Sequence, residues 1–289
     1  MERFCKRVLV PIDLGATCIP ALHYAAIFAR RFDADVTLMY ADELSSLFSD
    51  YNPAGIEERL RAFAAEHAPE IEKPETIVVP EHPVTAIVRA IPRTGSDLVI
   101  MGTHGRRGWR RALAGSVADG VVRAASRPVL VVPEHRHQSK PERITRVICP
   151  VNFTDAARGA AASAAALAAA FDAELILVHV AENDINAPDA AAIHDYFESW
   201  VTDDMRSHSS FREIVLRGGA AERVLDCVED LGADLLVVGA QVKWLRSESV
   251  IGTTSERLLR FAPVPVLTVT RAPVEAPREH PVIEEASHE

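Results

Sequence analysis

The sequence predicts an α/β protein built from two consecutive parallel sheets, each covered by helices on both faces. Short apolar runs alternate with segments of helical periodicity, which is the pattern of βαβ units. The same order of segments then returns in the second half of the chain. With 289 residues, of which 48% are hydrophobic, the chain is long enough for two domains with packed cores.

The first half alternates strands and helices. Strands are expected at 6–12, 36–41, 76–79, 97–101 and 128–132, and helices at 20–32, 53–67, 84–91 and 115–125. The strands are almost continuously apolar, as expected for a parallel sheet that is buried on both faces. Right-handed crossovers then leave few topologies.

The second half repeats the first. Arg7–Asp13 (RVLVPID) returns 139 residues later as Arg146–Asn152 (RVICPVN), and Asp97–Gly102 (DLVIMG) returns 137 residues later as Asp234–Gly239 (DLLVVG). A repeat this long indicates duplicated domains rather than a solenoid, whose units have about 20–50 residues. We therefore expect a first domain at 1–133, a linker at 134–143, a second domain at 144–271 and a disordered tail, rich in Pro and Glu, at 272–289.

A glycine-rich loop lies between a predicted strand and a predicted helix. Gly102 and Gly105 follow the strand, and Gly115-Ser116 follows after nine further residues. Glycine lets the backbone approach an anion, and the N–H groups of a first helical turn point at it. Ser116 adds a hydroxyl, and Arg106 or its neighbour a counter-charge. A G-x-x-G alone also ends strands, but the pattern G-x2-G-x9-G-S in this position predicts a phosphate-binding loop.

This spacing, the V-P-I-D motif at Val10–Asp13 and the R-P-V-L-V-V segment at Arg127–Val132 resemble the universal stress protein family, whose ATP-binding members carry the glycine pattern. The likeness covers nearly the whole chain and implies a tandem protein with two Rossmann-like domains of the adenine nucleotide alpha hydrolase type. Each domain would be an open five-stranded parallel sheet with strand order 3-2-1-4-5. Nucleotide would bind at the carboxyl ends of strands 1 and 4, as the switch-point rule expects.

The resemblance implies a nucleotide site in the first repeat. Asp13, in the same motif as Pro11, would hydrogen-bond the adenosine, and the backbone of Ala41 would face adenine. The ribose and phosphates would lie along Met101, Gly102, Gly105, Arg106, Gly115, Ser116 and Val117. Taken alone, Asp13 is equally well interpreted as a helix N-cap or turn residue. The expected ligand is ATP, with ADP or AMP as alternatives, and any Mg²⁺ would arrive with the nucleotide.

The second repeat departs from this pattern at two positions. Asn152 stands where Asp13 stands, and Val242 replaces the second glycine of the loop. A β-branched side chain resists positive φ and occupies space beside the phosphates. We therefore expect a degenerate site in repeat 2, where Gly252-Thr253 would hold at most a lone anion.

Association is expected through the fifth strands, which single-domain members of the family use for dimerisation. Val129–Val132 and Val266–Val269 would pair within one chain as a pseudo-dimer, because an unpaired edge strand is an association surface. Further association into a homodimer remains open.

A helical stripe of apolar residues is interpreted as core rather than as a partner groove: Ile193, Phe197, Trp200 and Val201.

Composition narrows the functional classes. The net charge of −10 argues against general affinity for nucleic acid. The sequence has no apolar run long enough for a bilayer span and no signal-peptide pattern, which favours the cytoplasm. Its four cysteines form no C-x-x-C pair, so neither a zinc site nor a redox motif is indicated.

Three functional hypotheses follow. The first is a nucleotide-binding stress or regulatory protein that hydrolyses ATP slowly at most. The second is an interaction scaffold without nucleotide. The third is an ATPase or nucleotidyl-transfer enzyme, for which His104 is the only obvious base beside the loop, so no catalytic residue is assigned.

Overall fold

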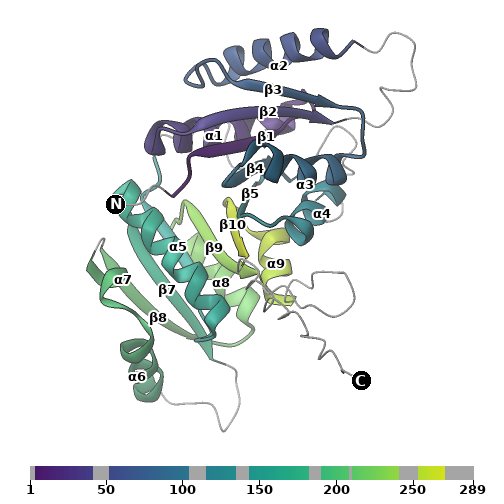
Figure 1. Ribbon diagram of the computed structural model, residues 1–289. Coiled ribbons are helices and arrows are strands. Elements are labelled where there is room, and N and C mark those ends of the chain that lie inside the picture. Colours follow the sequence, from purple (N-terminus) through teal and green to yellow (C-terminus); the bar gives the residue numbers. More distant parts are fainter. Residues whose placement is uncertain are drawn as a thin grey trace, which may run out of the picture.

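The computed structural model describes residues 4–41, 52–103, 115–134, 143–181, 190–207, 210–240 and 253–270. Within these ranges, strands from both halves of the chain join into one sheet of ten strands. Their order is β3-β2-β1-β4-β5-β10-β9-β6-β7-β8. Figure 1 shows repeat 1, in purple and blue, above repeat 2, in green and yellow.

Repeat 1 has the predicted alternation of strands and helices, with the strand order 3-2-1-4-5. Its elements are β1 (Arg7–Pro11), the 3-10 turn η1 (Ala16–Cys18), α1 (Ile19–Phe32), β2 (Asp35–Ala41), α2 (Pro53–His67), β3 (Glu75–Val79), α3 (Pro83–Thr94), β4 (Leu98–Gly102), α4 (Ser116–Ala124) and β5 (Val129–Val132).

Repeat 2 mirrors this order, as the duplication predicts. Its elements are β6 (Arg146–Pro150), α5 (Asp155–Phe171), β7 (Glu174–Ala181), α6 (Ala190–Trp200), α7 (Asp203–Ser207), β8 (Phe211–Arg217), α8 (Ala220–Asp230), β9 (Leu235–Ala240), α9 (Thr253–Phe261) and β10 (Val266–Thr270). Two helices, α6 and α7, stand where repeat 1 has α2. The predicted tail at 272–289 lies outside the described residues.

The two repeats meet through their fifth strands, so the predicted intramolecular pairing is confirmed. β5 and β10 pair antiparallel, with Leu267 opposite Leu130. The buried hydroxyl of Thr268 donates to the carbonyl of Val129 at 3.1 Å. Because the strands within each repeat are parallel, the strands of repeat 2 run opposite to those of repeat 1, and their carboxyl ends lie at opposite edges of the sheet.

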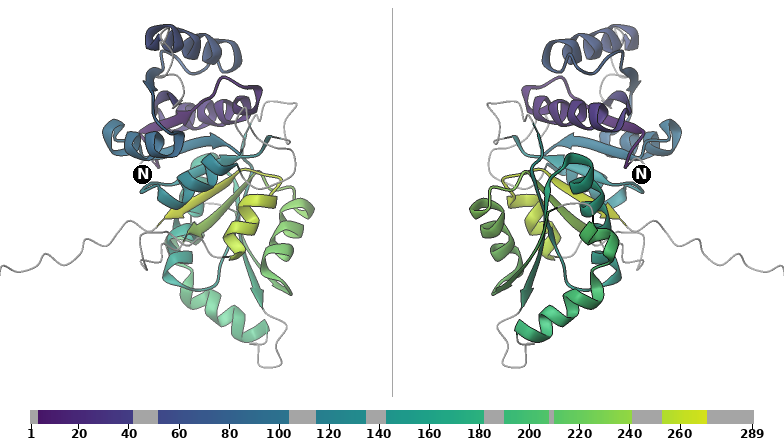
Figure 2. Two further views of the ribbon diagram at one scale, coloured as in Figure 1. Left: turned by 90° about the vertical axis from the view of Figure 1, so that its right-hand side faces the viewer. Right: turned by 90° about the vertical axis from the view of Figure 1, so that its left-hand side faces the viewer.

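Helices cover both faces of the sheet, as Figure 2 shows. One face packs against α1, α2, α5 and α6, and the other against α3, α4, α8 and α9. The apolar stripe of α6 and the turn after it is core, as predicted: Ile193, Phe197, Trp200 and Val201 are all buried. No helix in the described ranges combines the length and the apolarity that a bilayer crossing needs.

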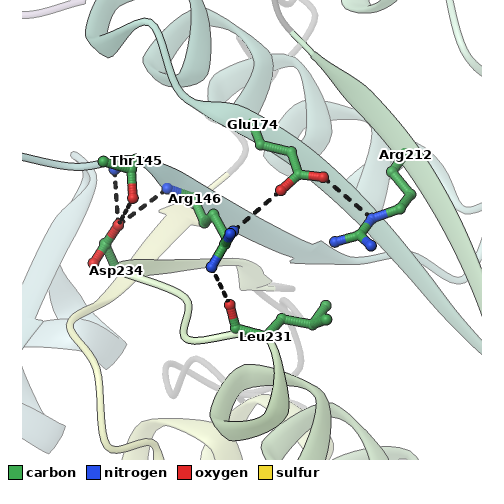
Figure 3. Close-up of polar contacts among 6 residues, drawn as sticks. All are labelled: Thr145, Arg146, Glu174, Arg212, Leu231 and Asp234. Carbon is green, nitrogen blue, oxygen red and sulfur yellow. Dashed lines mark hydrogen bonds and ion pairs between the residues drawn. The ribbon is translucent and has the colours of Figure 1, made fainter.

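Polar contacts fasten the amino ends of the strands in repeat 2 (Figure 3). One carboxylate oxygen of Asp234 accepts hydrogen bonds from the backbone and hydroxyl of Thr145, at 2.8 and 2.7 Å, and from the backbone of Arg146, at 3.1 Å. Glu174 forms ion pairs with Arg146 and Arg212, both at 3.2 Å. This cluster lies at the amino ends of the strands, opposite the carboxyl edge of repeat 2, and stabilises the fold.

Candidate functional site

The crevice at the carboxyl edge of repeat 1 arises where β1 and β4 separate. These strands are in register only at Val8–Leu98 and Leu9–Val99, whereas β1 pairs with β2 along five residues. Helix α1, which follows β1, covers one face of the sheet, and α4, which follows β4, covers the other. Strand order therefore reverses here, and an open α/β sheet places its ligand site at such a point.

Asp13 lies in a tight turn just beyond β1. Its Oδ1 accepts hydrogen bonds from the backbone of Gly15 at 2.9 Å and from the thiol of Cys18 at 2.8 Å. Burial, with the Asp13 charge as the second cause, raises the pKa of Cys18 to about 12. The thiol therefore stays protonated and donates a hydrogen bond to Asp13. The turn that contains Cys18 also contacts β4, which places Asp13 at the crevice.

Helix α4 begins beside the end of β4. The backbone N–H of Gly115 donates to the carbonyl of Thr103 at 2.5 Å. The backbone N–H of Thr103 in turn donates to the carbonyl of Val132 at 3.1 Å. Gly115 is the N-cap of α4 and makes no side-chain cap bond. The first helical bond runs from Asp119 to Gly115, so the N–H groups of Ser116 and Val117 precede it and point out of the helix end.

The other predicted residues are placed as follows. Pro11 ends β1 and Ala41 ends β2, so both lie at the same edge of the sheet as Gly102. Met101 is 5% exposed and packs in the core with α3 and α4, so its side chain is not available to a ligand. Gly105 and Arg106 of the loop, and the candidate base His104, lie outside the described residues.

The corresponding edge of repeat 2 differs in the same turn. Asn152 Oδ1 accepts a hydrogen bond from the hydroxyl of Thr154 at 2.7 Å, and Ala157 stands where repeat 1 has Cys18. A cavity of about 260 Å³ lies at this edge, lined by residues of both strand ends and helix starts. Val242 and Gly252, on which the expected degeneracy partly rests, lie outside the described residues.

Sequence reasoning missed two features of these sites. One is the contact between Cys18 and Asp13, which a spacing of five residues across a turn into a helix could have indicated. The other is the cavity of repeat 2. The sequence did carry a sign of the cavity, because repeat 2 has the smaller Val178 and Val238 where repeat 1 has Met39 and Met101.

Comparisons with known proteins agree with the fold. The model of the universal stress protein family matches residues 5–133 and 143–270. A universal stress protein of Methanocaldococcus jannaschii is 29% identical over 148 residues, which cover 47% of this chain and 87% of that protein. The crystal structure of a universal stress protein from Archaeoglobus fulgidus has a TM-score of 0.68 at 21% identity, covering 94% of this chain and all of that one, and this likeness bears on the fold alone.

A universal stress protein in complex with cAMP matches 44% of this chain and 95% of its own at 25% identity, with a TM-score of 0.36. Because the family model covers both halves of the sequence, the chain belongs to the universal stress protein family and carries two of its domains in tandem.

Proposed function

We propose that repeat 1 binds ATP at its carboxyl edge and acts as a nucleotide-dependent stress or regulatory protein. The observation that carries this proposal is the uncapped start of α4. The hydrogen bond from Gly115 to Thr103 holds it beside the end of β4, at the edge where Asp13 follows the neighbouring strand. The start of α4 suits the phosphates of a nucleotide, and Asp13 suits its adenosine.

The phosphates suit the start of α4. Backbone N–H groups that precede the first helical bond are free to bind an anion, and the helix dipole favours negative charge there. Gly115 has φ −51° and ψ 149° and carries no side chain that would obstruct a phosphate. The hydroxyl of Ser116 is exposed and adds a donor. Gly105 and Arg106 would complete this part of the site.

The adenosine suits the ends of β1 and β2. A carboxylate accepts hydrogen bonds from ribose hydroxyls, and the hydrogen bonds from Gly15 and Cys18 hold Asp13 in one orientation. The backbone of Ala41 lies at the same edge, beyond β2. We assign no catalytic residue, and the proposed role is to bind the nucleotide as a signal, with slow hydrolysis at most.

The test is isothermal titration of ATP, in the presence of Mg²⁺, into wild-type protein and into Gly115→Val. The backbone angles of Gly115 are accessible to valine, so the variant should fold while its side chain fills the space of the phosphates. Gly159→Val is the matched control, because a Cβ at Gly159 meets no atom within 4 Å. We expect binding to be lost in Gly115→Val only. Wild-type affinity in that variant would contradict the proposal.

Mass spectrometry of the small molecules released from denatured protein gives the stoichiometry. One adenine nucleotide per chain supports a single competent site. Two per chain would mean that repeat 2 also binds nucleotide and that the substitutions at Asn152 and Val242 are tolerated.

A further inference from the structure

Strand β8 is the last strand of the sheet at the end formed by repeat 2, and within the ranges that the structure describes no strand pairs with its outer edge (Figure 1). The carbonyl of Ser210 accepts a hydrogen bond from Leu175, and the N–H of Gly218 donates to Ala181, so the even-numbered residues direct their backbone groups at β7. Because these groups alternate in direction along a strand, the odd-numbered residues direct theirs outward, where they can pair with another strand. The outward residues are Phe211, Glu213, Val215 and Arg217.

The opposite end of the sheet, at β3, is less suited to pairing. By register, Thr76 and Pro80 stand where β8 and its end carry Glu213 and Arg217. A proline has no N–H to donate, and prolines are one of the devices that protect sheet edges. The side chain of Arg61, on α2, donates to the hydroxyl of Thr76 at 2.6 Å. Strand β8 has seven residues against five in β3 and contains no proline, so it offers the longer edge.

The side chains along the outer edge of β8 combine an apolar centre with two opposite charges. Phe211 packs on one face of the sheet, whereas Ile214 and Leu216 pack on the other, so the odd-numbered side chains share the face of Phe211. Val215 is 37% exposed and is one of three large apolar side chains that are exposed among the described residues. It stands between an acidic and a basic neighbour on that face. Such a pattern can be complementary to itself when it is reversed.

The carboxylate of Glu213 is only partly compensated within its own chain. Its side chain is 16% exposed, with His194 at 3.6 Å and Arg206 at 3.7 Å. Arg206 is shared, because it also forms an ion pair with Glu198 at 3.1 Å. Burial raises the pKa of Glu213, although the two cations act to lower it. A further cation beside this carboxylate would therefore be favourable.

One antiparallel register of β8 with a second copy of itself supplies that cation. Outward residues must face outward residues, and a two-fold axis at Val215 places Glu213 of each copy opposite Arg217 of the other. Val215 then faces its own symmetry copy. An axis at Glu213 would place two carboxylates opposite each other, and an axis at Ile214 would place Glu213 opposite Val215. Charge therefore selects the register that is centred on Val215.

We propose that two copies of this chain associate through β8, in the antiparallel register with Val215 on the two-fold axis. The sheets of the two chains then continue into each other. Each of three facing residue pairs exchanges two backbone hydrogen bonds, and the two pairs of Glu213 with Arg217 flank the central valines. This inference does not depend on nucleotide binding in repeat 1.

Sedimentation equilibrium of the full-length protein, from about 1 to 100 μM, tests the association. We expect a reversible dimer in the wild type. Arg217→Glu places like charges opposite each other at both ends of the contact, so the Kd of the dimer should rise about tenfold or more. Arg59→Glu is the matched control, because it reverses the charge of an exposed arginine on α2 of repeat 1, and it should leave the Kd unchanged. A monomeric wild type, or equal Kd values in the two variants, would overturn the proposal.

Cross-linking tests the register. The four native cysteines are buried, so bismaleimidoethane, a short reagent that joins two thiols, should leave the wild type uncoupled. Val215→Cys places two thiols beside the two-fold axis and should yield a covalent dimer, whereas Val78→Cys, the equivalent position on β3, should not. Both substitutions introduce a small side chain at a position that is not buried, so both variants should fold. Equal cross-linking of the two variants, or none in Val215→Cys, would refute pairing through β8 in this register.

Discussion

Replacement of Asp13 by asparagine tests the adenosine half of the proposed nucleotide site without disturbing the turn. The Oδ1 of an asparagine can accept the same hydrogen bonds, from Gly15 and from Cys18, that the carboxylate accepts. Repeat 2 shows that the fold tolerates this residue, because Asn152 occupies the equivalent turn and accepts a hydrogen bond from Thr154. The substitution thus removes a charge and turns one acceptor atom into a donor.

The expected loss follows from the chemistry of that one atom. A hydrogen bond to a charged acceptor contributes about 1.5–3 kcal/mol, and Asp13 is only half-buried, so water moderates the effect. We take about 1.5–2 kcal/mol, which corresponds to an increase in the Kd for ATP of about 10- to 30-fold. The free energy of unfolding should change by less than about 0.5 kcal/mol, because the internal hydrogen bonds of the turn remain.

Calorimetric titration of ATP measures the Kd, and urea unfolding measures the stability. Asp35→Asn is the matched control: it removes the same charge from an exposed position at the amino end of β2, away from the site. Its Kd for ATP should stay within about twofold of wild type. A wild-type Kd in Asp13→Asn, or an equal loss in the control, would refute a direct contact between Asp13 and the nucleoside.

Three further predictions concern stability. Asp234→Ala removes three hydrogen bonds and should lower the free energy of unfolding by about 1.5–3 kcal/mol. Asp97→Ala removes only the two hydrogen bonds from the backbones of Lys6 and Arg7 and should cost less. Urea unfolding measures both losses, and equal losses would contradict the argument from the number of hydrogen bonds. Leu267→Ala, at the buried seam between β5 and β10, should lower the free energy of unfolding by about 2–5 kcal/mol. In calorimetry both repeats should melt in one transition at a lower temperature, whereas two separate transitions would show that the repeats unfold independently. Burial raises the pKa of Cys5 to about 12 and also raises the pKa of Cys149, so both thiols ionise at lower pH in the unfolded chain than in the folded protein. The free energy of unfolding should therefore fall above about pH 8.5, by up to about 1.4 kcal/mol per pH unit for each thiol. Urea titrations of the double variant Cys5→Ala with Cys149→Ala should show a shallower decline.

Most of the secondary structure could be predicted because its signals are local. The bounds of α2, Pro53–His67, agree with the prediction because Asn52 caps the helix through the backbone of Gly55 and Pro53 suits its first position. The duplication predicted two similar domains, and the resemblance to the family implied their strand order and the pairing of the fifth strands, whose antiparallel direction the structure adds. These features depend on apolar periodicity, turn residues and one exposed edge, all of which are written along the chain.

The site was harder to predict because its features join residues that are distant in sequence or act through side-chain size. The cavity of repeat 2 is lined by Val178 of β7 and Val238 of β9, two strands that lie on either side of β6, and no local pattern reveals that they contribute to one cavity. The contact between Cys18 and Asp13 depends on the conformation of a turn, in which Leu14 has φ 61°. A sequence shows that a cysteine is apolar enough for burial, but not which neighbour accepts the hydrogen bond from its thiol.

The antiparallel seam between β5 and β10 has an evolutionary consequence. In a dimer of identical chains every mutation occurs twice, so a change that ruins one binding site ruins its symmetric copy as well. Here the two halves are encoded separately, although they pack together at the strand pair around Leu130 and Leu267 and through helix contacts such as Phe28 with Phe171. Each half can therefore accumulate substitutions at its own carboxyl edge without the same change appearing in the other.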